Sequence, residues 1–174
     1  MNTIALVVNP FASRVTEEKL QEVQLELTRA GEVSVFRTER PRHAIELVSD
    51  ACRGAFGAVV VFSGDGGFNE ALNGLDGELP IGFIPGGGTS VLPRALGLPS
   101  DPVAAARQIA GAIGERRIRR ITAGRVNGRR FGFSAGVGLD AEAVRRVDEM
   151  GRGDDGRRPG DLAFALAVDR KSVV

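Results

Sequence analysis

Two glycine-rich segments, each placed directly after a short apolar run, constrain the fold of this chain more than any other feature. Residues 63–70 read Ser-Gly-Asp-Gly-Gly-Phe-Asn-Glu and follow Val-Val-Val-Phe, and residues 85–90 read Pro-Gly-Gly-Gly-Thr-Ser and follow Ile-Gly-Phe-Ile. Each apolar run is typical of a strand. A side-chain-poor turn after a parallel strand lets backbone N–H groups approach a phosphate, and the next helix points its positive end there. Two such turns in consecutive strand–helix units therefore indicate one nucleotide that is bound from two sides.

The N-terminal part of the chain alternates strand patterns with amphipathic helix patterns. We expect strands at 4–8 and 33–36. Between and after them we expect a helix that begins near Thr16 and is capped by Gly31, and a helix that begins at Pro41 and ends at Gly54. Short helices are expected at 68–73 and 91–96, and a last helix after the cap Ser100-Asp101-Pro102. Strands separated by helices form a parallel sheet with right-handed crossovers and helices on both faces. The sequence thus predicts an α/β fold, an open doubly wound parallel sheet in a domain of residues 1–114, which binds ligands at the carboxyl ends of its strands.

The pattern changes after residue 114. Arginine-rich runs with interspersed apolar residues flank Asn127-Gly128, a dipeptide that strongly predicts a two-residue β-hairpin turn. We therefore expect the start of a β-rich second domain at 115–174. Because so short a domain would bury little surface, we also expect that the chain is a fragment of a longer protein or needs a partner.

Bulk composition excludes few functions. The formal net charge of +1 gives no reason to expect a nucleic-acid partner, and 43% hydrophobic residues suffice for a packed core. The N-terminus has no secretory signal pattern, and no apolar run reaches the roughly 18 residues of a membrane span. The single cysteine, Cys52, cannot form an internal disulfide, and no His/Cys cluster suggests zinc. We expect a cytoplasmic protein, and its oligomeric state stays open.

Several polar residues in and after the glycine turns could carry chemistry, and each has a structural alternative. Asp65, a carboxylate among glycines, could hold Mg²⁺ against a phosphate or accept a proton from a hydroxyl, unless the glycines only serve a tight turn with φ > 0. The hydroxyls of Thr89 and Ser90 could reach a phosphate or only cap the next helix. Seven arginines between Arg116 and Arg130 could meet anionic lipid headgroups or form the solvated face of a small sheet.

Three stretches resemble the diacylglycerol kinase catalytic-domain family, which includes bacterial diacylglycerol kinase-like lipid kinases and sphingosine kinases. They are Asn9-Pro10, residues 63–75 and residues 85–97, and the segment 131–142 also resembles the opening of the family's β-rich second domain. The family is related to NAD kinases and phosphofructokinases through a shared Gly-Asp-Gly turn, so the resemblance implies a fold of that type. The likeness spans nearly the whole chain but only about the N-terminal half of a typical member.

The resemblance implies an ATP-dependent kinase that phosphorylates the hydroxyl of a lipid, such as diacylglycerol or a sphingosine-like molecule, at a membrane surface to which it is peripheral at most. It implies ATP and Mg²⁺ as cofactors and Asp65 as the catalytic residue. The implied nucleotide-binding residues are Asn9, Thr38, Ser63, Gly64, Asp65, Gly66, Gly67, Asn69, Glu70, Gly86, Gly87, Gly88 and Thr89. Asp140 matches an aspartate that faces the cleft between the two domains. In bacterial members the acidic Mg²⁺ ligands and a proposed catalytic acid lie in the C-terminal half, which this chain does not reach.

The sequence departs from the family pattern at three positions. Gly67 stands where threonine is usual, Ser90 where asparagine is usual, and Pro93 where alanine is usual. Two alternatives to the lipid kinase therefore stay open. One is a related kinase that acts on a soluble substrate such as NAD, and the other is a nucleotide-binding module that lacks catalysis.

Overall fold

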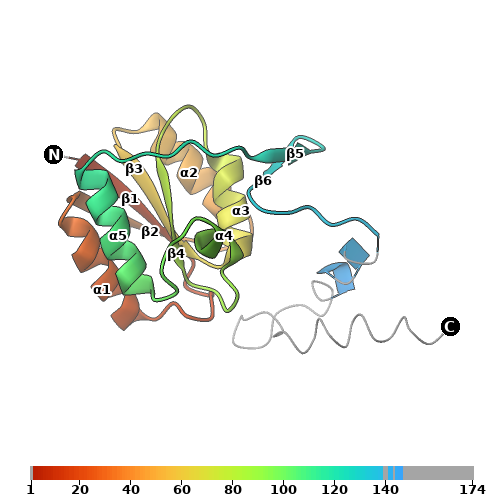
Figure 1. Ribbon diagram of the computed structural model, residues 1–174, viewed down its shortest axis with the longest axis horizontal. Helices are drawn as coiled ribbons and strands as arrows, with labels where there is room; N and C mark the ends of the chain where they lie inside the picture. Colours follow the sequence, from red (N-terminus) through yellow and green to blue (C-terminus); the bar gives the residue numbers. More distant parts are fainter. Residues whose placement is uncertain (1, 139–140, 143, 147–174) are drawn as a thin grey trace. The chain divides into compact units, whose positions relative to one another are not determined.

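The computed structural model describes residues 2–138, 141–142 and 144–146 (Figure 1). The chain divides into two compact units, Met1–Phe133 and Ser134–Val174. The elements of the first unit are β1 (Asn2–Val8), α1 (Glu17–Thr28), β2 (Gly31–Arg37), α2 (His43–Arg53), β3 (Ala58–Ser63), α3 (Asp65–Gly74), β4 (Ile81–Pro85), α4 (Val91–Ala95), α5 (Pro102–Gly114), β5 (Gly124–Val126) and β6 (Arg129–Phe131). In the second unit, the Glu142 carboxylate pairs with Arg145 and Arg146 at 2.8 and 3.1 Å.

Four parallel strands form the central sheet in the order β2-β1-β3-β4. In the register, Val8 lies opposite both Arg37 and Phe62, and Ser63 lies opposite Pro85. All four strands therefore end at the same edge of the sheet. The predicted α/β fold with an open parallel sheet is confirmed.

Helices cover both faces of this sheet, as the alternation of strand side chains requires. Ile4, Leu6 and Val60 belong to one core with the helices α1 and α5, whereas Ala5, Val7 and Val61 belong to a second core with α2 and α3. Figure 1 shows α1 beside α5 and α2 beside α3. The sheet is therefore doubly wound, as predicted.

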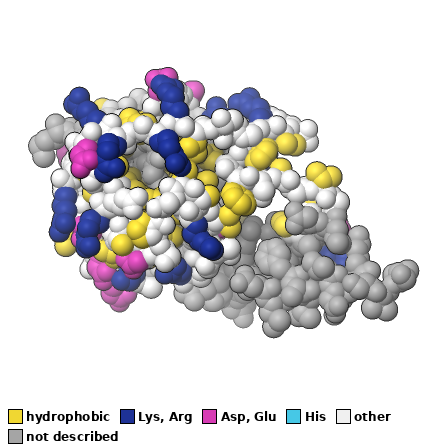
Figure 2. All heavy atoms as spheres, in the orientation of Figure 1, with side chains coloured by type: hydrophobic (Ala, Val, Ile, Leu, Met, Phe, Trp, Pro, Cys, Tyr) yellow, Lys and Arg dark blue, Asp and Glu magenta, His cyan; other side chains and the backbone are white. Residues whose placement is uncertain are grey.

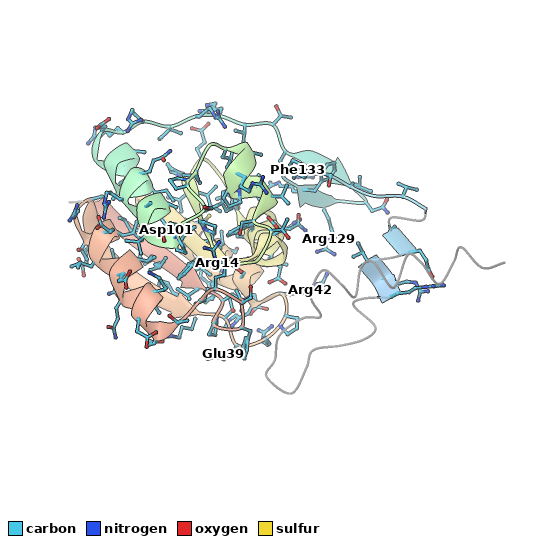
Figure 3. The ribbon with its side chains drawn as sticks, turned by 60° about the horizontal axis from the view of Figure 1, so that its bottom comes forward. Arg14, Glu39, Arg42, Asp101, Arg129 and Phe133 are labelled. Atoms are coloured by element: carbon cyan, nitrogen blue, oxygen red, sulfur yellow. The ribbon has the colours of Figure 1, made fainter. Side chains whose placement is uncertain are left out.

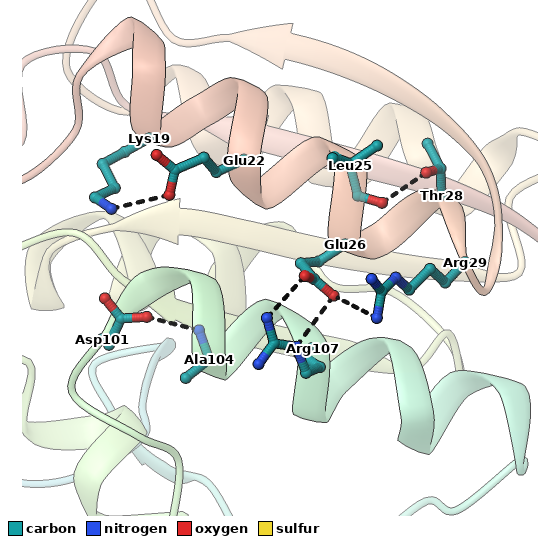
Figure 4. Close-up of polar contacts among 9 residues, drawn as sticks. All are labelled: Lys19, Glu22, Leu25, Glu26, Thr28, Arg29, Asp101, Ala104 and Arg107. Carbon is teal, nitrogen blue, oxygen red and sulfur yellow. Dashed lines mark hydrogen bonds and ion pairs between the residues drawn. The ribbon is translucent and has the colours of Figure 1, made fainter.

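A three-residue ion-pair group joins α1 to α5 on the first face. Arg107 donates from both Nε and Nη2 to the carboxylate of Glu26, at 3.3 and 2.9 Å, and Arg29 lies 3.1 Å from the same carboxylate (Figure 4). The Glu26 side chain is only 9% exposed. The hydrogen bond from Arg107 is the main reason that the pKa of Glu26 lies below its ordinary value of 4.5. A buried carboxylate is tolerated here because the arginines neutralise it.

The predicted helix boundaries are partly correct. The Thr16 hydroxyl accepts a hydrogen bond from Lys19 N at 3.2 Å, and Asp101 accepts one from Ala104 N at 2.8 Å, so both predicted N-caps are confirmed. The C-terminal cap predicted at Gly31 and the helix start predicted at Pro41 are wrong. Gly31 is instead the first residue of β2, because α1 already ends at Thr28.

Pro41 does not open α2. The residue that caps this helix is Arg42, whose φ of +68° sets a left-handed corner between the proline and the first helical residue, His43. This geometry excludes Pro41 from the first turn of the helix.

The predicted hairpin is confirmed and is attached to α3. Asn127 and Gly128 have φ of +47° and +79°, the left-handed pair that a type I′ turn needs. The Asn73 side chain donates to Arg130 O at 2.9 Å and accepts from Arg130 N at 2.8 Å. The Arg130 guanidinium donates to the backbone carbonyls of Leu72 and Leu75 at the end of α3. The hairpin therefore lies in the same compact unit as the sheet, and the second domain predicted at 115–174 stays a prediction.

Among the described residues, no helix is both long enough and apolar enough to span a membrane.

Candidate functional site

The carboxyl edge of the sheet brings together residues that are far apart in the sequence. Backbone hydrogen bonds join them: Thr38 N donates to Val8 O at 2.8 Å, Asn9 N to Phe62 O at 3.0 Å, and Gly86 N to Ser63 O at 2.7 Å. The expected residues Asn9, Thr38, Ser63 and Gly86 thus lie at the ends of four neighbouring strands, Ser63 as the last residue of β3. Ligands of open α/β sheets bind at this edge.

The two glycine turns are in direct contact. A Cβ atom added at Gly87 would lie 2.8 Å from the Cα of Gly64, which is closer than real Cβ contacts. A Cβ atom added at Gly86 would lie 2.8 Å from Val15 Cγ2 and 3.0 Å from Ser63 O. The backbones of the two turns therefore approach each other as the sequence predicted, and only glycine fits at positions 86 and 87.

Steric crowding, rather than a left-handed backbone, explains Gly67, Gly86 and Gly87. Among the described residues the positive-φ glycines are Gly77, Gly97, Gly128 and Gly138, and none of them lies in either turn. The alternative explanation of a tight turn with φ > 0 is therefore wrong. A Cβ atom added at Gly66 or Gly88 would meet nothing within 4 Å, so the backbone at these two residues faces open space.

Helix α3 begins earlier than predicted, at Asp65 instead of near Phe68, because Gly64 already has an extended backbone (φ −89°) and serves as the N-cap. Its carbonyl accepts from Phe68 N at 3.1 Å, and no side chain caps this end of the helix. The first N–H groups of a helix have no partner within the helix and carry the positive end of its dipole. Asp65, Gly66 and Gly67 therefore present backbone donors at the site.

Asp65 links the first glycine turn to the helix after the second. Its Oδ1 accepts a hydrogen bond from Leu92 N, in the first turn of α4, at 3.3 Å. The sequence left open whether the hydroxyls of Thr89 and Ser90 cap this helix, and Ser90, at the N-cap position, makes no side-chain capping hydrogen bond. Ser90 instead donates to Gly87 O at 3.1 Å, and Thr89 is exposed. Ser90 has a φ of +47°, a conformation that asparagine tolerates better than most residues, which fits its place at a position where the family usually has asparagine.

Ser63 holds a polar atom with no partner. Its Oγ is the one buried side-chain nitrogen or oxygen atom without a hydrogen bond in the part of the chain that the structure describes. A Cβ atom added at Gly67 would lie 2.1 Å from this Oγ. The serine therefore occupies the space that a threonine at position 67 would need. An unsatisfied buried hydroxyl costs about 1–3 kcal/mol, which is a reason to look for a functional role.

The other expected residues lie near this edge with less direct roles. The Asn9 Oδ1 accepts from Phe11 N at 3.1 Å and so shapes the loop after β1. Asn69 and Glu70 lie in α3, one turn beyond Asp65, and are partly buried. Asp140 lies outside the described residues.

Two arginines at this edge were not singled out from the sequence (Figure 3). Arg14 follows β1, and its backbone N donates to Gly86 O at 2.9 Å, which sets it beside the second glycine turn. Arg42 follows β2 and has the left-handed backbone described above. Neither guanidinium has an ion pair within the described residues, so both can neutralise an anion. No periodic pattern marks an isolated arginine in a loop, which is why sequence reasoning missed them.

The residues present fit part of a Mg²⁺ site. Mg²⁺ in phosphoryl-transfer sites binds one or two carboxylates together with substrate phosphates and waters. Asp65 supplies one carboxylate at the mouth of the sheet. No group of three His, Cys, Asp or Glu side chains comes together anywhere in the described ranges.

The comparisons with known proteins agree with this geometry. The family model described as diacylglycerol kinase catalytic domain matches residues 3–126. A diacylglycerol kinase of Bacillus subtilis is 32% identical over 84% of this chain and 49% of its own length. Human sphingosine kinase 2 is 34% identical over 53% of this chain and 16% of its own length.

A crystal structure of a diacylglycerol kinase from Bacillus anthracis str. Sterne superimposes with a TM-score of 0.67 and 24% identity, over 75% of this chain and 45% of that one. The chain spans about half the length of the curated relatives it matches. Because the family model covers well over half of its residues, the chain belongs to the diacylglycerol kinase catalytic-domain family.

Proposed function

We propose that this chain is the nucleotide-binding part of a lipid kinase, which transfers the γ-phosphoryl group of ATP to the hydroxyl of diacylglycerol or a sphingosine-like lipid. The contact between Gly64 and Gly87 carries the proposal, because it brings two side-chain-free turns to one point at the carboxyl edge of the sheet. The names of the relatives support the two lipid classes as acceptors.

The polyphosphate of ATP would bind where donors and positive charge gather. Backbone N–H groups at the start of α3 can donate to phosphate oxygens, and the open space beside Gly66 and Gly88 admits them to within hydrogen-bond distance. Arg14 and Arg42 can neutralise the remaining charge. Phosphoryl transfer depends mostly on such positioning and charge neutralisation.

Asp65 would have two functions in this site. It fixes α4 through Leu92 N, and its carboxylate keeps lone pairs for a metal ion or for the proton of the attacking hydroxyl. When bound, Mg²⁺ would reduce the negative charge on the transferring phosphoryl group. For such a kinase we propose a cytoplasmic location, peripheral to the membrane surface that holds the lipid.

The test combines binding with transfer. Calorimetry should detect ATP binding to this chain, and binding should be weaker in Gly86→Val, whose side chain would block the approach of the backbone and press on Val15 and Ser63. A full-length version should then be given radiolabelled ATP with diacylglycerol, sphingosine, ceramide or NAD. Label in a lipid supports the proposal, and label in NAD alone would assign the soluble-substrate kinase. ATP binding without transfer to any acceptor would leave a binding module.

A further inference from the structure

The hydroxyl of Ser63 is a buried polar group that the fold itself does not explain. Ser63 is the last residue of β3 and is only 1% exposed, and its Oγ has no hydrogen-bond partner among the residues that the structure describes. Buried polar groups in native proteins nearly always have a partner, so each exception needs an explanation. A ligand that accepts a hydrogen bond at this point would provide one.

This hydroxyl lies against the first turn of α3. Ser63 is two residues after Val61, so its side chain lies on the face of the sheet that α3 covers. A Cβ atom added at Gly67, the third residue of α3, would lie 2.1 Å from Ser63 Oγ and 2.8 Å from Ser63 Cβ. No side chain caps this end of the helix, whose first N–H groups carry the positive end of its dipole. The hydroxyl and these N–H groups are therefore hydrogen-bond donors gathered at one place.

Positions 63 and 67 share a space that holds one hydroxyl. Because a γ oxygen lies one bond from its Cβ atom, a threonine at position 67 would place its side chain where Ser63 Oγ now lies. A serine at position 63 and a threonine at position 67 therefore exclude each other. Position 67, where the family usually has threonine, is glycine in this chain. The one hydroxyl at this place thus comes from the strand β3 instead of the helix α3.

We propose that Ser63 and Gly67 are a coupled pair: Ser63 supplies the hydroxyl that the missing threonine would supply, it donates to a phosphate oxygen of the nucleotide, and Gly67 leaves room for it. Figure 2 shows Lys and Arg side chains scattered over the visible face of the first unit, so positive charge alone does not fix where a phosphate binds. A donor held at the end of β3 does. The inference rests on the proposed nucleotide-binding function and adds to it the dependence of one position on the other.

The first test is Ser63→Ala, which removes the hydroxyl and no other heavy atom. It should melt at or above the wild-type temperature, because the lost donor has no partner in the fold, and should bind ATP about 10- to 100-fold more weakly, as expected for one hydrogen bond to a charged group. Ser90→Ala is the control for stability, and it should melt lower because its hydroxyl donates to Gly87 O at 3.1 Å. Ser49→Ala on α2 is the control for calorimetry and should bind ATP like the wild type.

The second test exchanges the two positions. Gly67→Thr alone should melt lower and bind ATP more weakly, because its side chain collides with Ser63 Oγ. Ser63→Gly alone should bind ATP as weakly as Ser63→Ala. The double variant Ser63→Gly/Gly67→Thr returns one hydroxyl to the shared space, from the helix, and should bind ATP more tightly than either single variant. If Gly67→Thr does not fold, Ser63→Ala still decides the outcome.

Two results would overturn the inference while the proposed function stands. In the first, the wild type and Ser63→Ala bind ATP equally well; if this variant also melts lower, the hydroxyl serves the fold and a buried water is its partner. In the second, the double variant binds ATP no better than the single variants, so the two positions are not coupled. A wild type that does not bind ATP would instead refute the proposed function, and the inference with it.

Discussion

Two neighbouring glycines provide a matched test of the contact between the turns. In Gly87→Ala the new methyl group would lie 2.8 Å from the Cα of Gly64, a backbone atom that cannot rotate away. In Gly88→Ala the same methyl group would meet nothing within 4 Å, and the backbone there is not left-handed. The two variants therefore carry the same substitution at adjacent positions.

The expected changes in stability have opposite signs. Overpacking costs about 1–3 kcal/mol, which lowers the melting temperature of a unit of this size by about 2–12 °C, so Gly87→Ala should melt lower by that amount. Gly88→Ala should melt at or above the wild-type temperature, because replacing glycine at a compatible backbone position stabilises a protein by about 0.4–1 kcal/mol. The methyl group of Gly88→Ala would, however, fill the space through which a phosphate approaches. Losing a hydrogen bond to a charged phosphate costs about 1.5–3 kcal/mol, so ATP should bind about 10- to 100-fold more weakly.

Thermal unfolding and ATP calorimetry on the two variants and the wild type measure these changes. A Gly87→Ala protein that melts at the wild-type temperature would show that the turns do not touch in solution. A Gly88→Ala protein that binds ATP as tightly as the wild type would show that the phosphate does not approach this turn.

Three further predictions concern Asp65, Asn73 and Glu26. Asp65→Asn should keep the hydrogen bond from Leu92 N and the melting temperature but abolish turnover in a full-length version, with Asp76→Asn as the control; near-normal turnover would remove Asp65 from the mechanism. Asn73→Ala leaves the backbone of Arg130 unpaired and should cost about 1–3 kcal/mol in urea unfolding while ATP affinity stays unchanged, and an equal loss of both would contradict the division of roles. Because the pKa of Glu26 is lowered, its contribution to stability is complete above its ordinary value of 4.5 and is lost as the pH falls through the lowered pKa. Glu26→Gln should therefore flatten this part of the stability–pH curve. Parallel curves for the variant and the wild type would show that ionisation of Glu26 is not the cause of the pH dependence.

Sequence patterns were sufficient to predict the sheet and the edge that carries the site. The continuous apolar runs of β1 and β3 and the helices between strands leave few topologies other than a parallel sheet, so the turns after β3 and β4 had to lie at one edge. The hairpin at Asn127-Gly128 was predictable because its turn depends on two adjacent residues. Both predictions follow from local chemistry and chain connectivity.

The reason for the glycines was not predictable from the sequence. A glycine can be required because the backbone has φ > 0 or because there is no room for a Cβ atom, and residue identity alone does not distinguish these two reasons. The contact of Gly64 with Gly87 and the position of Ser63 Oγ against Gly67 appear only when the chain is folded. The left-handed backbones of Arg42 and Ser90, which precede α2 and α4, were likewise not predictable, because neither residue is a glycine.

The polar residues at the two ends of α3, Asp65 and Asn73, also form contacts that the sequence does not reveal. These contacts fix the second glycine turn's helix and the hairpin to α3. Asp65 reaches an amide 27 residues away, and Asn73 reaches a strand 57 residues away. Both Asp65 and Asn73 pair with backbone groups. Because every residue has such groups, the sequence does not show which residue is the partner. Position 65 requires only an acceptor for one N–H group, whereas position 73 requires a donor and an acceptor on two separate atoms, as in an amide side chain. An ionised aspartate could therefore not replace Asn73, and this one helix sets the distance between the glycine turns and the hairpin.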